Sequence, residues 1–93
     1  MQHSYVFGTV QETRRTGIYV IRVKDDQIDP IEADEIAELM RKKMLSRGEV
    51  VADVVVVEGD TKETLRLYGS PYSVSRVRSA MFNAAIRWQP IDL

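Results

Sequence analysis

The sequence predicts one α+β domain, a two-layer ββαββα fold in which a four-stranded, mostly antiparallel sheet carries both helices on one face. Three observations support this fold class. Four stretches rich in β-branched and aromatic residues are separated by turn-forming residues. Two segments with apolar residues at helical spacing each follow a capping residue and begin with proline. A chain of 93 residues is long enough for one domain with a modest core.

The first hairpin is predicted over residues 4–24. Apolar and polar residues alternate over 5–11 and again over 18–23, and Gly17 ends a polar turn between them. Arg14 and Arg15 in this turn could contact phosphate or an acidic partner. Exposed hairpin turns commonly carry charge for solubility, which is the simpler interpretation.

The first helix is predicted over residues 30–47, with Asp29 as its N-cap, Pro30 at its first position and Gly48 as its stop. Acidic residues lie near its start and basic residues near its end, which suits the helix dipole. Its predicted core face consists of Ala33, Ile36, Ala37, Met40 and Met44. The acidic group Asp25, Asp26, Asp29 and Glu32 fits no calcium-loop spacing, so we interpret it as a capped helix entry and predict no metal site.

The second hairpin is predicted over residues 49–68 and contains the valine run 50–57. Alternation divides this run into two faces. One face is wholly apolar (Val50, Ala52, Val54, Val56), and we expect the helices to cover it. The other carries a carboxylate among valines (Val51, Asp53, Val55, Val57), and we expect the chain to leave it open.

The second helix is predicted over residues 71–88, with Ser70 as N-cap, Pro71 at its first position and Pro90 as a stop. Its predicted apolar face consists of Val74, Val77, Met81, Ala84, Ala85 and Trp88. A polar stripe lies opposite, formed by Tyr72, Arg76, Ser79, Asn83 and Arg87.

Several function classes are disfavoured by composition. The chain has no cysteine, and its one histidine, His3, lies next to the chain start. No phosphate-binding glycine loop or serine-nucleophile motif is present, so we predict neither an enzyme nor a cofactor site. No signal peptide or membrane span is evident, which predicts a cytoplasmic protein without a membrane partner.

The preferred hypothesis is a protein-association module that binds a second copy of itself, as a homodimer, or another protein through the open sheet face. Exposed apolar patches often mark such interfaces. The predicted interface consists of Val51, Asp53, Val55, Val57, Arg66, Tyr68 and Arg22, with Asp53 paired to one of the two arginines.

The alternative hypothesis is nucleic-acid binding. Sheet aromatics could stack on bases, or the second helix could use its polar stripe of Tyr72, Arg76, Ser79, Asn83 and Arg87. A net charge of −1 and a pI near 5.8 argue against this hypothesis. A third hypothesis, a small-molecule site lined by Met40, Met44 and Met81, is weaker because methionines at such spacing usually fill a core.

Overall fold

A computed structural model describes residues 5–10, 16–23, 27–59, 65–83 and 85–93. In this part of the chain the element order is β1 (Tyr5–Val10), β2 (Ile18–Val23), α2 (Pro30–Ser46), β3 (Asp53–Glu58), β4 (Arg66–Tyr68), α3 (Pro71–Phe82) and β5 (Ile86–Pro90). The five strands form one mixed sheet in the order β4-β3-β2-β1-β5. The α+β class is therefore confirmed, while the four-stranded sheet is wrong in detail.

Both helix starts form as the sequence predicts. Asp29 is extended, and its carboxylate accepts a hydrogen bond of 2.8 Å from the Glu32 backbone N–H, while Pro30 is the first helical residue. Ser70 caps α3 in the same way, accepting from the Ser73 N–H at 3.4 Å. Each cap satisfies a backbone donor that has no partner inside its helix. Gly48 has a φ of +81°, which suits the glycine predicted to end α2.

The two hairpins of the sheet are joined by a parallel pair of strands. β1 and β2 pair antiparallel, as do β3 and β4, so both predicted hairpin pairings are confirmed. However, β2 and β3 pair in parallel, with Ile18 opposite Asp53 and Val23 opposite Glu58. This pairing arises because α2 is a crossover that returns the chain to the starting end of β2.

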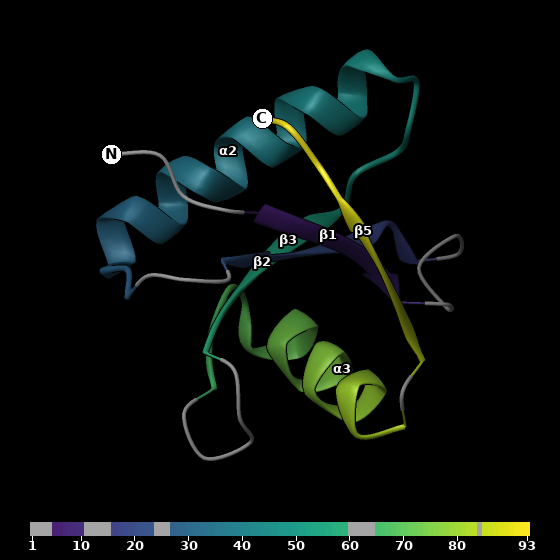
Figure 1. Cartoon of the computed structure of the whole chain (residues 1–93). Coiled ribbons are helices and arrows are strands. Elements are labelled where there is room, and N and C mark those ends of the chain that lie inside the picture. The colour runs from purple at the N-terminus through teal and green to yellow at the C-terminus, as the bar shows by residue number, and fades with distance from the viewer. Residues whose placement is uncertain (1–4, 11–15, 24–26, 60–64, 84) are drawn as a thin grey trace.

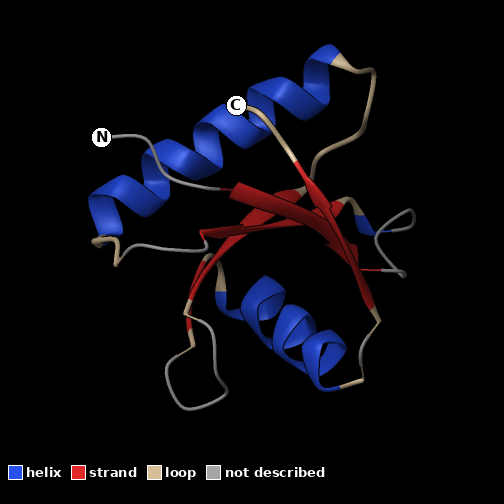
Figure 2. Ribbon diagram, in the orientation of Figure 1, coloured by secondary structure: helices blue, strands red, loops and turns tan. Residues whose placement is uncertain are grey.

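The prediction that both helices cover one face of the sheet is wrong. Figure 1 and Figure 2 show α2 on one face and α3 on the other. Side chains on the α2 face form one core, namely Tyr19, Ile21, Val23, Ile28, Ala33, Ile36, Met40, Met44, Val54 and Val56. The α3 face holds a second core of Val10, Ile18, Val20, Val55, Val57, Val77, Ala80 and Ile86. Since both faces of β2 and β3 are covered, their valine-rich sequences are those of doubly buried strands.

The second helix is shorter than the predicted span 71–88. α3 ends at Phe82, with Asn83 as its C-cap, and residues Ile86–Pro90 form the edge strand β5, antiparallel to β1. The helix ends early because the side chains after Ala85 alternate between the core and solvent, which is the periodicity of a strand and not of a helix. Ile86 is buried and Trp88 half-buried, both against the α3-side core.

Other predictions fall outside the described residues. These are the proposed turn contacts of Arg14 and Arg15, the acidic residues Asp25 and Asp26, and the position of His3. In the described part of the chain no helix is long and apolar enough to cross a membrane.

Candidate interaction surface and polar pockets

The interface predicted on the sheet does not form one open surface. Val55 and Val57 have no exposed area and lie in the core beneath α3. Val51 and Tyr68 pack instead against the core on the α2 side, and the Tyr68 hydroxyl donates to the Ile28 carbonyl at 3.2 Å. The open sheet face is thus a wrong prediction, because α3 occupies it.

Asp53 pairs with neither of the arginines proposed for it. Its Oδ2 accepts a hydrogen bond of 2.8 Å from the Ser70 hydroxyl, and its Oδ1 accepts one of 2.8 Å from the Val54 backbone N–H. Its cationic neighbour is instead Arg41, whose Nη2 lies 3.9 Å from Oδ1, at the outer limit of an ion pair. Asp53 therefore links the start of β3 to Ser70, the N-cap of α3, by a hydrogen bond. Arg66 is exposed on β4, opposite Glu58 in the ladder.

The Asp53 carboxylate makes the stability of the fold depend on pH. Burial raises the pKa of Asp53, but hydrogen bonds from the Ser73 and Ser70 hydroxyls and from backbone N–H groups outweigh burial, so the pKa lies below its usual value. A lowered folded-state pKa adds stability above the unfolded-state pKa, and this stability is lost as the pH falls through the folded-state value. We expect Asp53→Asn to be less stable than the wild type at pH 7, with the difference shrinking below about pH 4. Urea unfolding at several pH values tests this expectation, and a difference independent of pH would contradict it.

Arg22 belongs to a different surface. Its Nη2 and Nε donate to the Gly59 carbonyl at 2.9 and 3.2 Å, and its guanidinium carbon lies 5.9 Å from the centroid of the Trp88 ring. Trp88 lies over Gly8 of β1, since a Cβ on Gly8 would approach the indole to 2.8 Å. These contacts hold the Arg22 guanidinium over the half-buried Trp88 ring, on the α3 side of the sheet.

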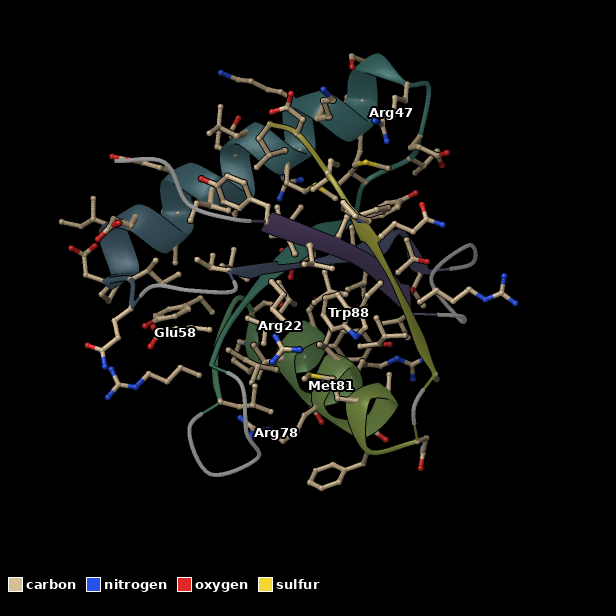
Figure 3. All side chains as sticks on the ribbon, viewed as in Figure 1. Arg22, Arg47, Glu58, Arg78, Met81 and Trp88 are labelled. Carbon is tan, nitrogen blue, oxygen red and sulfur yellow. The ribbon has the colours of Figure 1, made fainter. Side chains whose placement is uncertain are left out.

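Three residues of α3 extend this feature. Met81 is half-buried and packs against the same core as Trp88, while Arg78 and Phe82 are exposed. Arg78 is three residues before Met81 and four before Phe82, so its side chain neighbours each of theirs on the helix surface. Figure 3 shows Arg22, Met81 and Trp88 between the sheet and α3, with Arg78 beside them. We call this set, Arg22, Arg78, Met81, Phe82 and Trp88, the Trp88 surface.

No protein-family model, curated protein or solved structure matches this chain. Hypotheses about its function therefore rest on its own geometry.

Four of the five residues in the polar stripe predicted for the second helix lie on α3 or its C-cap. Tyr72, Arg76, Ser79 and Asn83 lie at the helical spacing of α3 and its C-cap, and the Arg76 guanidinium carbon lies 5.7 Å from the Tyr72 ring centroid. Arg87 does not belong to the stripe, because it lies in β5 between Ile86 and Trp88, whose side chains point to the α3 face. Arg76, Ser79 and Asn83 line a pocket of about 430 Å³.

A second pocket, of about 380 Å³, lies between α2 and the start of α3. Its charged lining residues are Asp34, Glu38, Arg41 and Asp53. Among the residues that the structure describes, no group of three or more histidine or acidic side chains is placed to hold a metal ion. The methionines proposed to line a small-molecule site are separated by the sheet: Met40 and Met44 lie in the α2-side core, and Met81 packs on the α3 side.

Sequence reasoning selected Arg22 but missed Trp88, Met81 and Phe82 as its companions. Trp88 and Met81 fit the apolar spacing of a long helix, so both were expected to be core residues. The alternation in Ile86-Arg87-Trp88-Gln89 was the available signal that this segment is a strand.

Proposed function

We propose that this protein is a non-catalytic protein-association module that binds its partner through the Trp88 surface. The observations that carry the proposal are the position of Arg22 over Trp88, the packing of Met81 against the same core as Trp88, and the exposure of Arg78 and Phe82 one helical turn apart on α3. Tryptophan, phenylalanine, methionine and arginine are enriched at protein interfaces, and tryptophan and arginine dominate their binding energy. Phe82 adds an aromatic side chain with 64% of its surface exposed.

The charge of this surface favours an acidic partner. Its exposed charged side chain, Arg78, is cationic. A two-fold symmetric contact between two copies would place two copies of this arginine in one interface, and like charges at an interface are unfavourable. We therefore propose that the partner is a different protein with an acidic segment that also carries apolar side chains. This choice replaces the self-association expected from the sequence.

The proposal can be tested with exposed residues whose loss leaves the fold intact. The probe is a labelled peptide that combines glutamate and leucine residues, and the natural reporter is Trp88, the one tryptophan of the chain. We expect the peptide to change Trp88 fluorescence, and Arg78→Glu with Phe82→Ser to weaken its binding by about tenfold or more.

Matched controls exist on the same molecule. Tyr72 is about as exposed as Phe82, at 63% against 64%, but lies at the opposite end of α3. Arg87 is exposed on β5, on the opposite face of the sheet. We expect Tyr72→Ser and Arg87→Glu to bind the peptide like the wild type. Equal weakening by both pairs of substitutions would refute the assignment to the Trp88 surface, as would sedimentation showing that the wild type forms a dimer which Arg78→Glu dissociates.

A further inference from the structure

A series of contacts across the sheet connects the end of β3 to the Trp88 indole. Arg22 of β2 donates two hydrogen bonds to the Gly59 carbonyl, from Nη2 at 2.9 Å and from Nε at 3.2 Å. The same guanidinium lies over the Trp88 ring of β5, with 5.9 Å between its carbon and the ring centroid (Figure 3). Two donors of Arg22 are therefore engaged within the fold, while its positive charge lies at the indole.

Gly8 makes the contact between Arg22 and Trp88 possible. β1 lies between β2 and β5, and Gly8 is opposite Val20 on one side and Trp88 on the other. Neighbouring strands are about 4.8 Å apart, so side chains of β2 and β5 must cross about 10 Å to meet. A Cβ at Gly8 would lie 2.8 Å from the Trp88 ring, so the indole occupies the space that a side chain on β1 would fill. The ring thus reaches across β1 toward Arg22.

Gly59 anchors the other end of this series of contacts. It directly follows β3 and has a φ of +106°, a conformation that residues with a side chain rarely adopt. Because the direction of a carbonyl depends on the backbone dihedrals, this conformation helps to set where the Gly59 oxygen meets Arg22. Two hydrogen bonds to one acceptor also restrict the Arg22 side chain, which is otherwise rich in rotamers.

We propose that Arg22 is a positioning residue of the Trp88 surface. Held by the Gly59 carbonyl, it fixes the indole in the orientation that the partner meets, while the exposed Arg78 supplies the charge that attracts an acidic segment. The end of β3 thereby controls the shape of a surface formed by β5 and α3. This role in binding rests on the proposed function, whereas the orientation of Trp88 can be measured in the free protein.

Acrylamide quenching of fluorescence in the free protein tests the positioning of Trp88, the one tryptophan of the chain. We expect Arg22→Gln to raise the quenching constant by about twofold or more, because the ring loses the cation that restrains it. Gly59→Ala should raise it in the same direction, and adding Gly59→Ala to Arg22→Gln should have no further effect, since Gly59 acts through Arg22. Arg78→Gln, the matched removal of an exposed arginine, should leave quenching unchanged. Equal quenching in Arg22→Gln and the wild type would overturn the proposal, as would additive effects of the two substitutions.

The peptide of glutamate and leucine residues tests the consequence for binding. Arg22→Gln should weaken its binding by about threefold or more but leave the salt dependence of the dissociation constant unchanged, whereas Arg78→Gln should reduce that salt dependence. A reduced salt dependence in Arg22→Gln would show that Arg22 contacts the peptide directly and would overturn the positioning role, as would unchanged affinity. If the wild type does not bind the peptide, the proposed function fails, and quenching still decides whether Arg22 positions Trp88.

Discussion

Replacing Met40 with alanine is expected to lower the free energy of unfolding by about 2–5 kcal/mol. Met40 has no exposed area and lies in the core between α2 and the sheet, together with Ile36 and Met44 of the same helix. Truncation removes apolar surface from this core and leaves a cavity that rigid neighbours fill only in part. The large loss is expected because α2 provides the cover for this face of β2 and β3.

Leu39 provides the matched control for Met40. It is the preceding residue of the same helix, but 47% of its surface is exposed. Leucine, methionine and alanine all favour helices, so Leu39→Ala should cost well below half as much as Met40→Ala. Urea unfolding followed by circular dichroism measures both values. Equal losses would contradict the placement of α2 and its buried face.

The second large effect is expected from Gly8→Ala, which should cost about 1–3 kcal/mol. A Cβ at this position would lie 2.5 Å from Ile86 Cγ2 and 2.8 Å from Trp88 Cε3. Both contacts are shorter than side chains tolerate, so β5 must shift away from β1 or Trp88 must change its rotamer. Adding a methyl group to a strand would otherwise be favourable, because glycine loses more backbone entropy on folding.

A double-mutant cycle isolates the cause of the Gly8→Ala effect. Ile86→Ala removes the nearest clashing atom, so Gly8→Ala should cost less in that background than in the wild type. The single tryptophan reports the displacement directly, because Gly8→Ala should change the fluorescence of Trp88. Additive costs and unchanged fluorescence would show that β5 does not pack against Gly8 in this way.

Much of the local structure could be predicted from the sequence because it depends on neighbouring residues. Asp29-Pro30 and Ser70-Pro71 specify helix starts through a capping side chain and a fixed proline φ, and both form as expected. The core face of α2 follows from apolar spacing, and Ala33, Ile36, Met40 and Met44 are buried.

The sheet topology could not be predicted because it depends on distant residues. Alternation in the valine run predicts two faces of a strand, but it does not indicate which helix covers each face. An antiparallel arrangement was the simplest interpretation of consecutive hairpins, whereas the long α2 crossover makes the parallel β2–β3 pair possible. The end of the second helix was ambiguous for another reason. Met81, Ala85 and Trp88 fit a helical face, so the spacing of apolar residues did not show where the helix ends and β5 begins.

The position of β1 between β2 and β5 has a consequence for how this chain folds. β1 pairs with the strand that follows it and also with the last strand described, so that Val6 lies opposite Pro90. While the chain is being synthesised, the hairpin, the crossover and α3 can all form before residues 86–90 emerge from the ribosome. Until then the outer edge of β1 keeps unpaired backbone groups, a state prone to pairing with other chains. We expect closure of β5 onto β1 to be a late step, slowed by the long loop that it must close.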